Sequence, residues 1–274
     1  MSRSSIAAAR SWAMPRAEPR HLLILGGTAE ARSLAAAAST RFAAALRVTT
    51  SLAGRTRNLP SLAGEVRRGG FGGAAGLAAY LDAARIDLVI DATHPFAARI
   101  TAAAAEACAA RGVPLLGLAR PPWIPQAGDR WIEVADAAEA AIRLPELGRC
   151  AFLTIGSGAL AAFSQVAGVR FLVRLIAAPA AALPLADYEL ILGRGPFTFA
   201  EERLIMTRHG VDVLIAKASG GTATAAKLEA ARALGIAVLM LRRPPRNGGP
   251  SVASVDAALA WIEKGLTASR EGMS

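Results

Sequence analysis

The amino-acid sequence predicts an α/β protein with two domains of similar size, each built on a parallel sheet, and a cleft between the domains. The main observation is an alternation of short apolar runs with helical stretches of roughly 10–15 residues, the order that βαβ units produce. This order stops at 118–131, where three prolines fall within five positions. Prolines at that density exclude a helix or a central strand. We therefore interpret this stretch as the connection between the domains.

The first half of the chain is expected to hold strands separated by helices. The apolar strands are expected to end at Leu25, Thr50, Ile90 and Leu118. The helices are expected at 28–40, 73–84 and 96–111, and "EVRRG" at 65–69 suggests a further short strand. Ligands of parallel sheets bind beyond the carboxyl ends of the strands. The loops that follow strands are therefore where functional residues are expected.

The same rhythm returns in the second half. Strands are expected at 150–155, 170–176, 188–192, 211–216 and 236–241, with helices near 158–166, 198–209 and 222–234. A last helix, about 254–265, follows the Pro/Gly-rich "RRPPRNGGPS". The expected organisation is an extension at 1–20, domains at 21–119 and 131–250, a linker at 120–130, and a C-terminal helix and tail at 251–274.

Composition and charge restrict the class of protein. The 274 residues carry a formal charge of +10, with 31 Lys and Arg against 21 Asp and Glu. The basic residues are scattered and not interleaved with aromatics, which disfavours a nucleic-acid partner and leaves polyanionic small molecules. No apolar run approaches ~18 residues, so no transmembrane helix is predicted. Cys108 and Cys150 show no disulfide or metal-ligand pattern, which suggests free thiols in a cytoplasmic protein.

The first 20 residues, "MSRSSIAAARSWAMPRAEPR", lack the apolar core of a signal peptide. We interpret them as a disordered basic extension. A start at Met14 and a transit peptide remain open alternatives.

The loop after the first strand carries Gly26, Gly27 and Thr28 before a helix. A helix N-terminus offers unpaired N–H groups and a partial positive charge to a phosphate. The glycines let the backbone approach such a ligand, and Thr28 can cap the helix. The pattern is not the GxGxxG fingerprint, so a plain strand-to-helix turn is the alternative.

The loop after the second strand reads "SLAGRTRN", with Ser51, Arg55 and Thr56. In an NAD-binding unit an acidic residue near this place binds the ribose 2′-hydroxyl. Here no carboxylate follows the strand. An arginine with small hydroxyl residues instead suits a 2′-phosphate. The loop therefore points to NADPH rather than NADH, unless its arginines are merely solvated.

The third loop, "DATHPFA", places Asp91, Thr93 and His94 at a strand end. Pro95 is expected in the first turn of the next helix, with Thr93 or His94 near its N-cap. His94 is one of three histidines in the chain. A lone histidine is often structural, but this position favours a role in the cleft.

Cations recur beside glycines in the second domain. Arg194 lies between two glycines in "LGRGPF", and Lys217 precedes Ser219 and Gly220 in "AKASGGT". "TIGSGAL" repeats the strand–glycine–helix pattern at Gly156. These loops suit anionic ligands, or are turns with solvated charges. No Ser-His-Asp set, HExxH motif or metal-ligand spacing is present in the sequence.

Several of these motifs together resemble the precorrin-6A reductases of cobalamin biosynthesis. They are "LILGGTAEARSLA", "SLAGR", "DATHPFAARIT", "GRGPFT" and "AKASGGTATAAKLEAARALGIAVLMLRRP", and the resemblance covers about 21–265. "DATHPFA" and Lys-x-Ser-Gly-Gly are the more specific motifs. Many members of the family are expected to carry Asn where this chain has Ala218.

The resemblance implies two Rossmann-like domains with NADPH in the cleft, and an oxidoreductase that reduces one double bond of precorrin-6A to give precorrin-6B. It implies cofactor contacts at Gly26, Gly27, Thr28, Ser51, Arg55, Thr56, Asp91, Thr93 and His94. It implies substrate contacts at Arg120, Trp123, Arg194, Lys217, Ser219 and Gly220. No metal is expected, and the sequence indicates no proton donor.

Two alternatives to this activity stay open. One is reduction of the cobalt-containing macrocycle. The other, more distant, is a non-catalytic module that senses NADPH. The expected partner is the polycarboxylate tetrapyrrole alone, with the protein a monomer or weak homo-oligomer.

Overall fold

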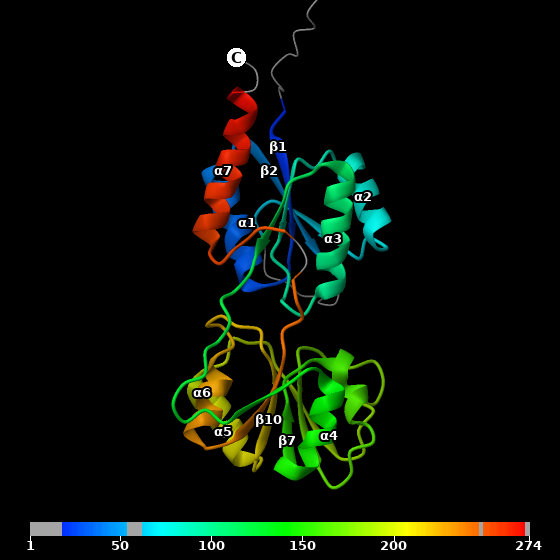
Figure 1. Ribbon diagram of the computed structural model, residues 1–274, viewed down its shortest axis with the longest axis vertical. Coiled ribbons are helices and arrows are strands. Elements are labelled where there is room, and N and C mark those ends of the chain that lie inside the picture. Colours follow the sequence, from blue (N-terminus) through cyan, green and yellow to red (C-terminus); the bar gives the residue numbers. More distant parts are fainter. Residues whose placement is uncertain (1–17, 54–61, 247–248, 272–274) are drawn as a thin grey trace, which may run out of the picture.

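Two separate parallel sheets, stacked end to end along the long axis of the molecule, form the fold (Figure 1). The computed structural model describes residues 18–53, 62–246 and 249–271. Each sheet has six strands, and every neighbouring pair of strands is parallel. Helices cover both faces of each sheet, as expected for parallel strands that must be buried on both sides.

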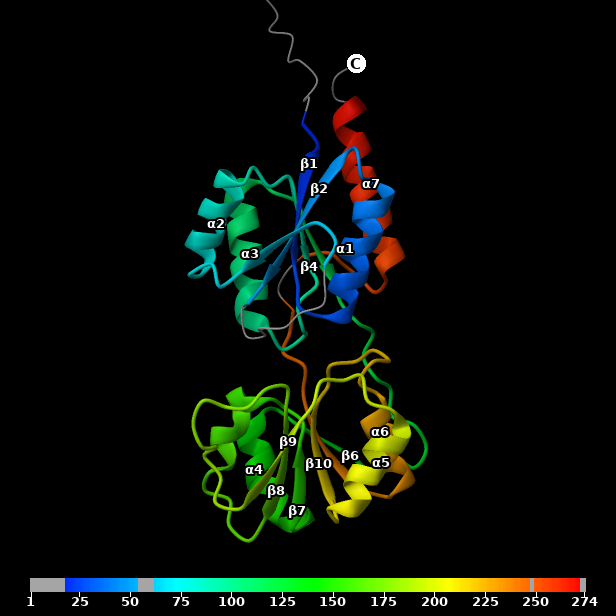
Figure 2. The ribbon, with the colours of Figure 1, turned by 180° about the vertical axis from the view of Figure 1, so that it is seen from behind.

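The first sheet has the strand order β12-β5-β4-β1-β2-β3. Its strands are β1 Arg20–Leu25, β2 Leu46–Leu52, β3 Glu65–Arg68, β4 Leu88–Asp91, β5 Leu115–Leu118 and β12 Ser251–Val252. Its helices are α1 Ala29–Arg41, α2 Ala74–Ala83, α3 Ala98–Arg111 and α7 Val255–Glu271. Helices α1 and α7 cover one face, and α2 and α3 the other (Figure 2).

The second sheet has the order β6-β11-β10-β7-β8-β9. Its strands are β6 Trp131–Val134, β7 Cys150–Leu153, β8 Arg170–Leu175, β9 Tyr188–Leu192, β10 Val213–Lys217 and β11 Ala237–Leu241. Its α-helices are α4 Ala137–Leu147, α5 Phe199–Arg208 and α6 Ala226–Ala233, and a 3₁₀ helix spans Ser157–Phe163. Two apolar cores, one on each face, fill the space between sheet and helices.

The alternation read from the sequence is confirmed, with local corrections. The helix expected at 158–166 is a 3₁₀ helix that ends at Phe163. Helix α3 begins at Ala98, with Ala97 at its N-cap, so Pro95 is not in its first turn. The reason is a turn closed by the Ala97 N–H, which donates to the His94 carbonyl. Strands β6 and β12 and helix α4 were not predicted.

The chain passes between the two sheets twice. The first crossover is 119–130, and the second runs from Arg242 to Pro250, after which β12 pairs with β5 and α7 packs on α1 (Figures 1 and 2). The C-terminal strand and helix thus complete the first sheet, not the second. Among the described residues, no helix is long and apolar enough to cross a membrane.

Candidate functional site

The two glycines of the turn between β1 and α1 have different reasons: Gly26 lets the helix pack closely on the sheet, and Gly27 has a positive φ and open space around it. An added Cβ at Gly26 would lie 3.0 Å from Ala31 Cβ and 3.1 Å from Thr50 Cγ2, and Gly27 has a φ of 123°. The Thr28 hydroxyl accepts from the Ala31 N–H at 3.1 Å and donates to a carbonyl at 2.8 Å, so it is already used. The backbone N–H groups of the first helical turn are therefore the donors suited to a phosphate.

A carboxylate lies in that same first turn, and a cation from the first crossover neutralises it. Glu30 forms an ion pair with Arg120 at 2.8 Å, and the Arg120 side chain is only 9% exposed. An unpaired carboxylate here would repel a bound phosphate. Arg120 therefore has a defined partner in the first domain, beside the position expected for the cofactor.

Ser51 lies at the carboxyl end of β2 and pairs in register with Arg67 of β3. Arg67 Nη1 donates to Ser51 Oγ at 3.4 Å, and its guanidinium lies 3.8 Å from the Phe71 ring centroid. Arg55 and Thr56 lie outside the described residues. Sequence reasoning missed Arg67, although "EVRRG" placed two arginines at the end of an expected strand.

Asp91 is almost completely buried at 1% exposure, and both its carboxylate oxygens are used within the protein. Oδ1 accepts from the Thr93 hydroxyl at 2.6 Å and the Thr93 N–H at 3.0 Å. Oδ2 accepts from the Thr101 hydroxyl at 2.7 Å and from Arg246 Nη2 at 2.9 Å. The structure therefore makes Asp91 a residue that fixes its loop and the second crossover.

The next residues of that loop reach the second domain. Phe96 packs against the apolar core of the second domain. His94 lines a cavity there, and its Nδ1 accepts from the Phe96 N–H at 3.2 Å. Burial, with Arg120 and Lys217 nearby, lowers the pKa of His94 to about 4. His94 is therefore a neutral imidazole near pH 7 with its proton on Nε2.

The cavity that His94 lines has a volume of about 850 Å³ and lies at the carboxyl ends of the second sheet. Lys217 and Ser219 line it, and Lys217 Nζ lies 5.3 Å from the Phe96 ring centroid. Arg194 is exposed and is not among the lining residues, although Gly193 and Gly195 beside it are. The structure thus brings His94, Lys217 and Ser219 together and leaves Arg194 at the surface.

Gly220 and Trp123 belong to the contact between a second-domain loop and the first crossover. Gly220 has a φ of 69°, and an added Cβ there would collide with the Pro121 carbonyl. Trp123 Nε1 donates to the Gly221 carbonyl at 2.7 Å. Arg243 strengthens this contact, since its guanidinium donates to backbone carbonyls on both sides.

Three charged residues in the cavity wall were not foreseen. Arg174 makes two bonds of 2.9 Å with Glu202, and these side chains are 9% and 3% exposed. Lys227 of α6 is 7% exposed. Burial and the charge of Arg174 lower the pKa of Lys227 to about 8. The only signal for Lys227 in the sequence is that it is a single lysine within the alanine-rich segment "TAAKLEAAR".

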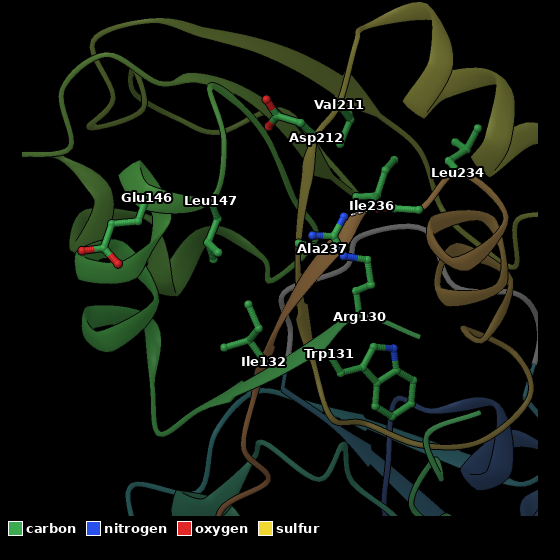
Figure 3. Close-up of a pocket in the computed structure, with 11 residues that line it drawn as sticks. Arg130, Trp131, Ile132, Glu146, Leu147, Val211, Asp212, Leu234, Ile236 and Ala237 are labelled. Carbon is green, nitrogen blue, oxygen red and sulfur yellow. Dashed lines mark hydrogen bonds between the residues drawn. The ribbon is translucent and has the colours of Figure 1, made fainter. Parts of the chain in front are cut away.

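A second cavity, of about 520 Å³, lies at the amino ends of β6, β10 and β11, at the opposite edge of the second sheet (Figure 3). Arg130 and Asp212 line it, but Asp212 already accepts from the N–H groups of Arg149 and Cys150. None of the predicted site residues lies there. Within the described ranges, no group of three or more metal-ligating residues could hold an ion.

Comparisons with known proteins agree with the motifs. The family model "Precorrin-6x reductase CbiJ/CobK" matches residues 21–263. Precorrin-6A reductase of Rhodococcus erythropolis is 50% identical over 88% of this chain and 96% of that protein. The Mycobacterium tuberculosis protein of the same name is 45% identical over 88% of this chain and 96% of its own length.

A solved structure, "CobK precorrin-6A reductase", aligns with a TM-score of 0.85 and 39% identity, covering 90% of this chain and 97% of the other. A cobalt-precorrin-6A reductase of Priestia megaterium is 30% identical over 58% of this chain and 66% of that protein.

Proposed function

The chain belongs to the precorrin-6x reductase CbiJ/CobK family, and from this premise we propose that it reduces one double bond of precorrin-6A to give precorrin-6B in cobalamin biosynthesis, with NADPH as the reductant. One observation carries the proposal beyond family membership. The cation-lined cavity of the second domain opens beside His94, which follows the strand next to the phosphate-binding turn. A nucleotide on the first domain and a macrocycle on the second would therefore meet at this loop.

The residues of the first domain fit a dinucleotide. Gly27 leaves open space for a pyrophosphate at the N-terminus of α1, where the helix favours negative charge. Ser51 and Arg67 lie at the strand ends where the adenosine ribose is held in such folds, and Arg67 can bind a 2′-phosphate. When bound, the reduced nicotinamide supplies a hydride. We assign Asp91 and Thr93 to holding the loop that faces it.

The residues of the second domain fit a polycarboxylate. A volume of about 850 Å³ is in the upper range for small-molecule sites. Lys217 and Lys227 place ammonium groups in the wall, while the Phe197 ring and the backbone of Gly156 provide apolar and close-contact surface. The protein binds the carboxylate arms, excludes water and holds the macrocycle against the nucleotide.

The curated relatives favour the metal-free macrocycle over its cobalt complex. Proteins named precorrin-6A reductase are 40–50% identical to this chain over 88–89% of its length. Proteins named cobalt-precorrin-6A reductase are 30% identical over 58–62%. The cytoplasmic location and the monomer or weak oligomer remain predictions from the sequence.

The decisive experiment is an anaerobic assay with purified protein, NADPH and each macrocycle in turn. Consumption of one NADPH per precorrin-6A, with a matching change in the macrocycle spectrum, supports the proposal. Faster turnover of the cobalt complex would reassign the substrate. NADPH binding without oxidation in the presence of either macrocycle would favour the sensing module.

Cofactor preference tests the 2′-phosphate assignment separately. Arg67→Ala should weaken NADPH binding by ~1.5–3 kcal/mol, the scale of a hydrogen bond to a charged group, and leave NADH binding unchanged. Arg68→Ala is the matched control, because Arg68 is exposed on the opposite face of β3. Arg55→Ala should show the same selectivity as Arg67→Ala if both arginines reach the phosphate. Equal losses for both nucleotides would show that neither arginine recognises it.

A further inference from the structure

We propose that Lys227 is the general acid that delivers a proton to the macrocycle during its reduction. This inference rests on the proposed function, and it assigns the one chemical role that neither the sequence nor the family name gives to a residue.

Lys227 lies in the wall of the cavity although its side chain is almost fully buried. It projects from the first turns of α6, is 7% exposed, and lines the same space as Lys217 and His94. Its ammonium lies 6.0 Å from the Trp123 ring centroid, a contact with the first crossover. A ligand in the cavity would therefore meet an ammonium that is shielded from bulk water.

The charge of Lys227 is poorly compensated. Glu202 is the carboxylate whose charge favours the ammonium, but both Glu202 oxygens already accept from Arg174 at 2.9 Å. In the described part of the chain the Lys227 ammonium makes no hydrogen bond to the protein. Arg174 and Arg120 oppose its charge, and with burial they lower its pKa to about 8. An ammonium in this state can release its proton near neutral pH, which an exposed lysine does not do.

The other ionisable groups of the cavity are less suited to this role. Arg174 does not lose its proton in proteins and is held by Glu202. Both oxygens of Glu202 accept charged hydrogen bonds from Arg174, so this carboxylate is already engaged within the protein. His94, with a pKa of about 4, is already neutral. Lys217 lies with its Nζ 5.3 Å from the Phe96 ring centroid, and we assign it to the carboxylate arms of the substrate.

The macrocycle gains a hydride and a proton across one double bond, so it gains two electrons, and the nicotinamide that supplies the hydride is oxidised. The Lys227 N–H bond breaks as a bond from that hydrogen to the macrocycle forms. The resulting neutral amine recovers its proton from water after product release.

The test replaces the acid while keeping its charge. Lys227→Arg retains a cation that cannot release a proton. Both kcat and the rate constant of single-turnover reduction should therefore fall roughly 10²–10⁴-fold, the range for general acids. KM for the macrocycle and Kd for NADPH should stay within about threefold, because binding depends on the charge that remains. Lys264→Arg, the same exchange at an exposed position of α7, is the matched control and should keep kcat near that of the wild type.

The pH profile gives a second readout. In the wild type, kcat/KM should fall as pH rises through about 8, where the free Lys227 loses its proton. This decrease should be absent in Lys227→Arg. Small primary amines added to Lys227→Ala should restore part of the rate, which a purely structural role would not produce.

The free protein provides a readout that needs no turnover. NMR of protein with isotope-labelled lysine should show one side chain titrating near 8 that is missing in Lys227→Met. Three results would each overturn the assignment: an unshifted pKa for Lys227, an increase in KM without a decrease in kcat for Lys227→Arg, or a kcat/KM of Lys227→Arg that still falls as pH rises through about 8. An inactive wild type with both macrocycles would instead refute the proposed reaction, so the two failures are distinguishable.

Discussion

Arg246 ties the second crossover to the end of β4, and Arg246→Met removes that tie while preserving length and apolar contact. The guanidinium donates to Asp91 Oδ2 at 2.9 Å and to the Asp91 carbonyl at 3.0 Å. Each such charged bond contributes about 1.5–3 kcal/mol. Asp91 keeps its donors on Thr93 and Thr101, and one guanidinium nitrogen of Arg246 is buried without a partner. The net loss should therefore be about 2–3 kcal/mol, below the ~3–5 of a fully orphaned buried pair.

Differential scanning calorimetry at pH 7 should show this loss as a Tm lower by roughly 5–10 °C, at about 2–4 °C per kcal/mol. Arg242→Met, an exposed change in the same crossover, should stay within ~0.5 kcal/mol. Gly117→Ala offers an independent route, because its Cβ would lie 2.6 Å from Arg246 Nη2. The double variant Arg246→Met/Gly117→Ala should lose less unfolding free energy than the sum of the losses in the two single variants. Full additivity, or a loss in Arg246→Met no larger than in the control, would refute this account of the contact.

Three further predictions follow from the site and the chain ends. The pKa of His94 is lowered to about 4 in the folded protein, so its contribution to stability is present above pH 6.5 and is lost as pH falls toward 4. Between pH 7 and pH 5 the wild type should therefore lose roughly 2 kcal/mol more unfolding free energy than His94→Gln, as measured by calorimetry. Lys217→Ala should raise KM for the macrocycle by roughly tenfold or more, because it loses a charged contact of about 1.5–3 kcal/mol. Arg194→Ala should have the KM of the wild type. A tenfold loss of NADPH affinity in Lys217→Ala, measured without substrate, would assign Lys217 to the cofactor instead. A chain that starts at Pro19 should keep its Tm and activity, because the preceding residues lack apolar periodicity, and a Tm lower by several degrees would show that they dock.

The sequence predicted the first sheet well because its strands carry their own information. Apolar runs such as 22–25 and 88–90 are buried on both faces, so the hydrophobic pattern directly reports the strand. The loops after these strands then had to share one edge of the sheet. That reasoning placed Gly26, Ser51 and His94 at the same edge, where the structure has them.

What the sequence did not reveal depends on contacts between distant segments. Strand β12 has two residues, so only its pairing with β5 identifies it as a strand. Helix α4 contains Pro145, which argues against a helix when read locally. Lys227 is a single cation in an alanine-rich helix, and its burial follows from the packing of α6 against the sheet.

Arg194 and Lys217, the two candidate substrate-binding cations of the second domain, also show what a single sequence cannot predict. Arg194 and Lys217 both stand near glycines at strand ends, so their local sequences are equivalent. Only Lys217 is the last residue of a central strand, and it therefore faces the cavity. Arg194 lies two residues beyond the edge strand β9 and is exposed. Strand order, which a single sequence does not supply, separates the two.

The return of the chain to the first sheet sets the order in which the protein can form on the ribosome. Strand β12 and helix α7 are synthesised after the whole second domain, yet they cover β5 and α1, which are synthesised before it. The second domain lies wholly between the two crossovers, so it can fold while the tail is still within the exit tunnel. The first domain, although it precedes the second in the chain, reaches its final packing only after β12 and α7 have emerged. Until then the apolar face of α1 lacks its partner, and a chain truncated before β12 would leave the first domain, rather than the second, incomplete.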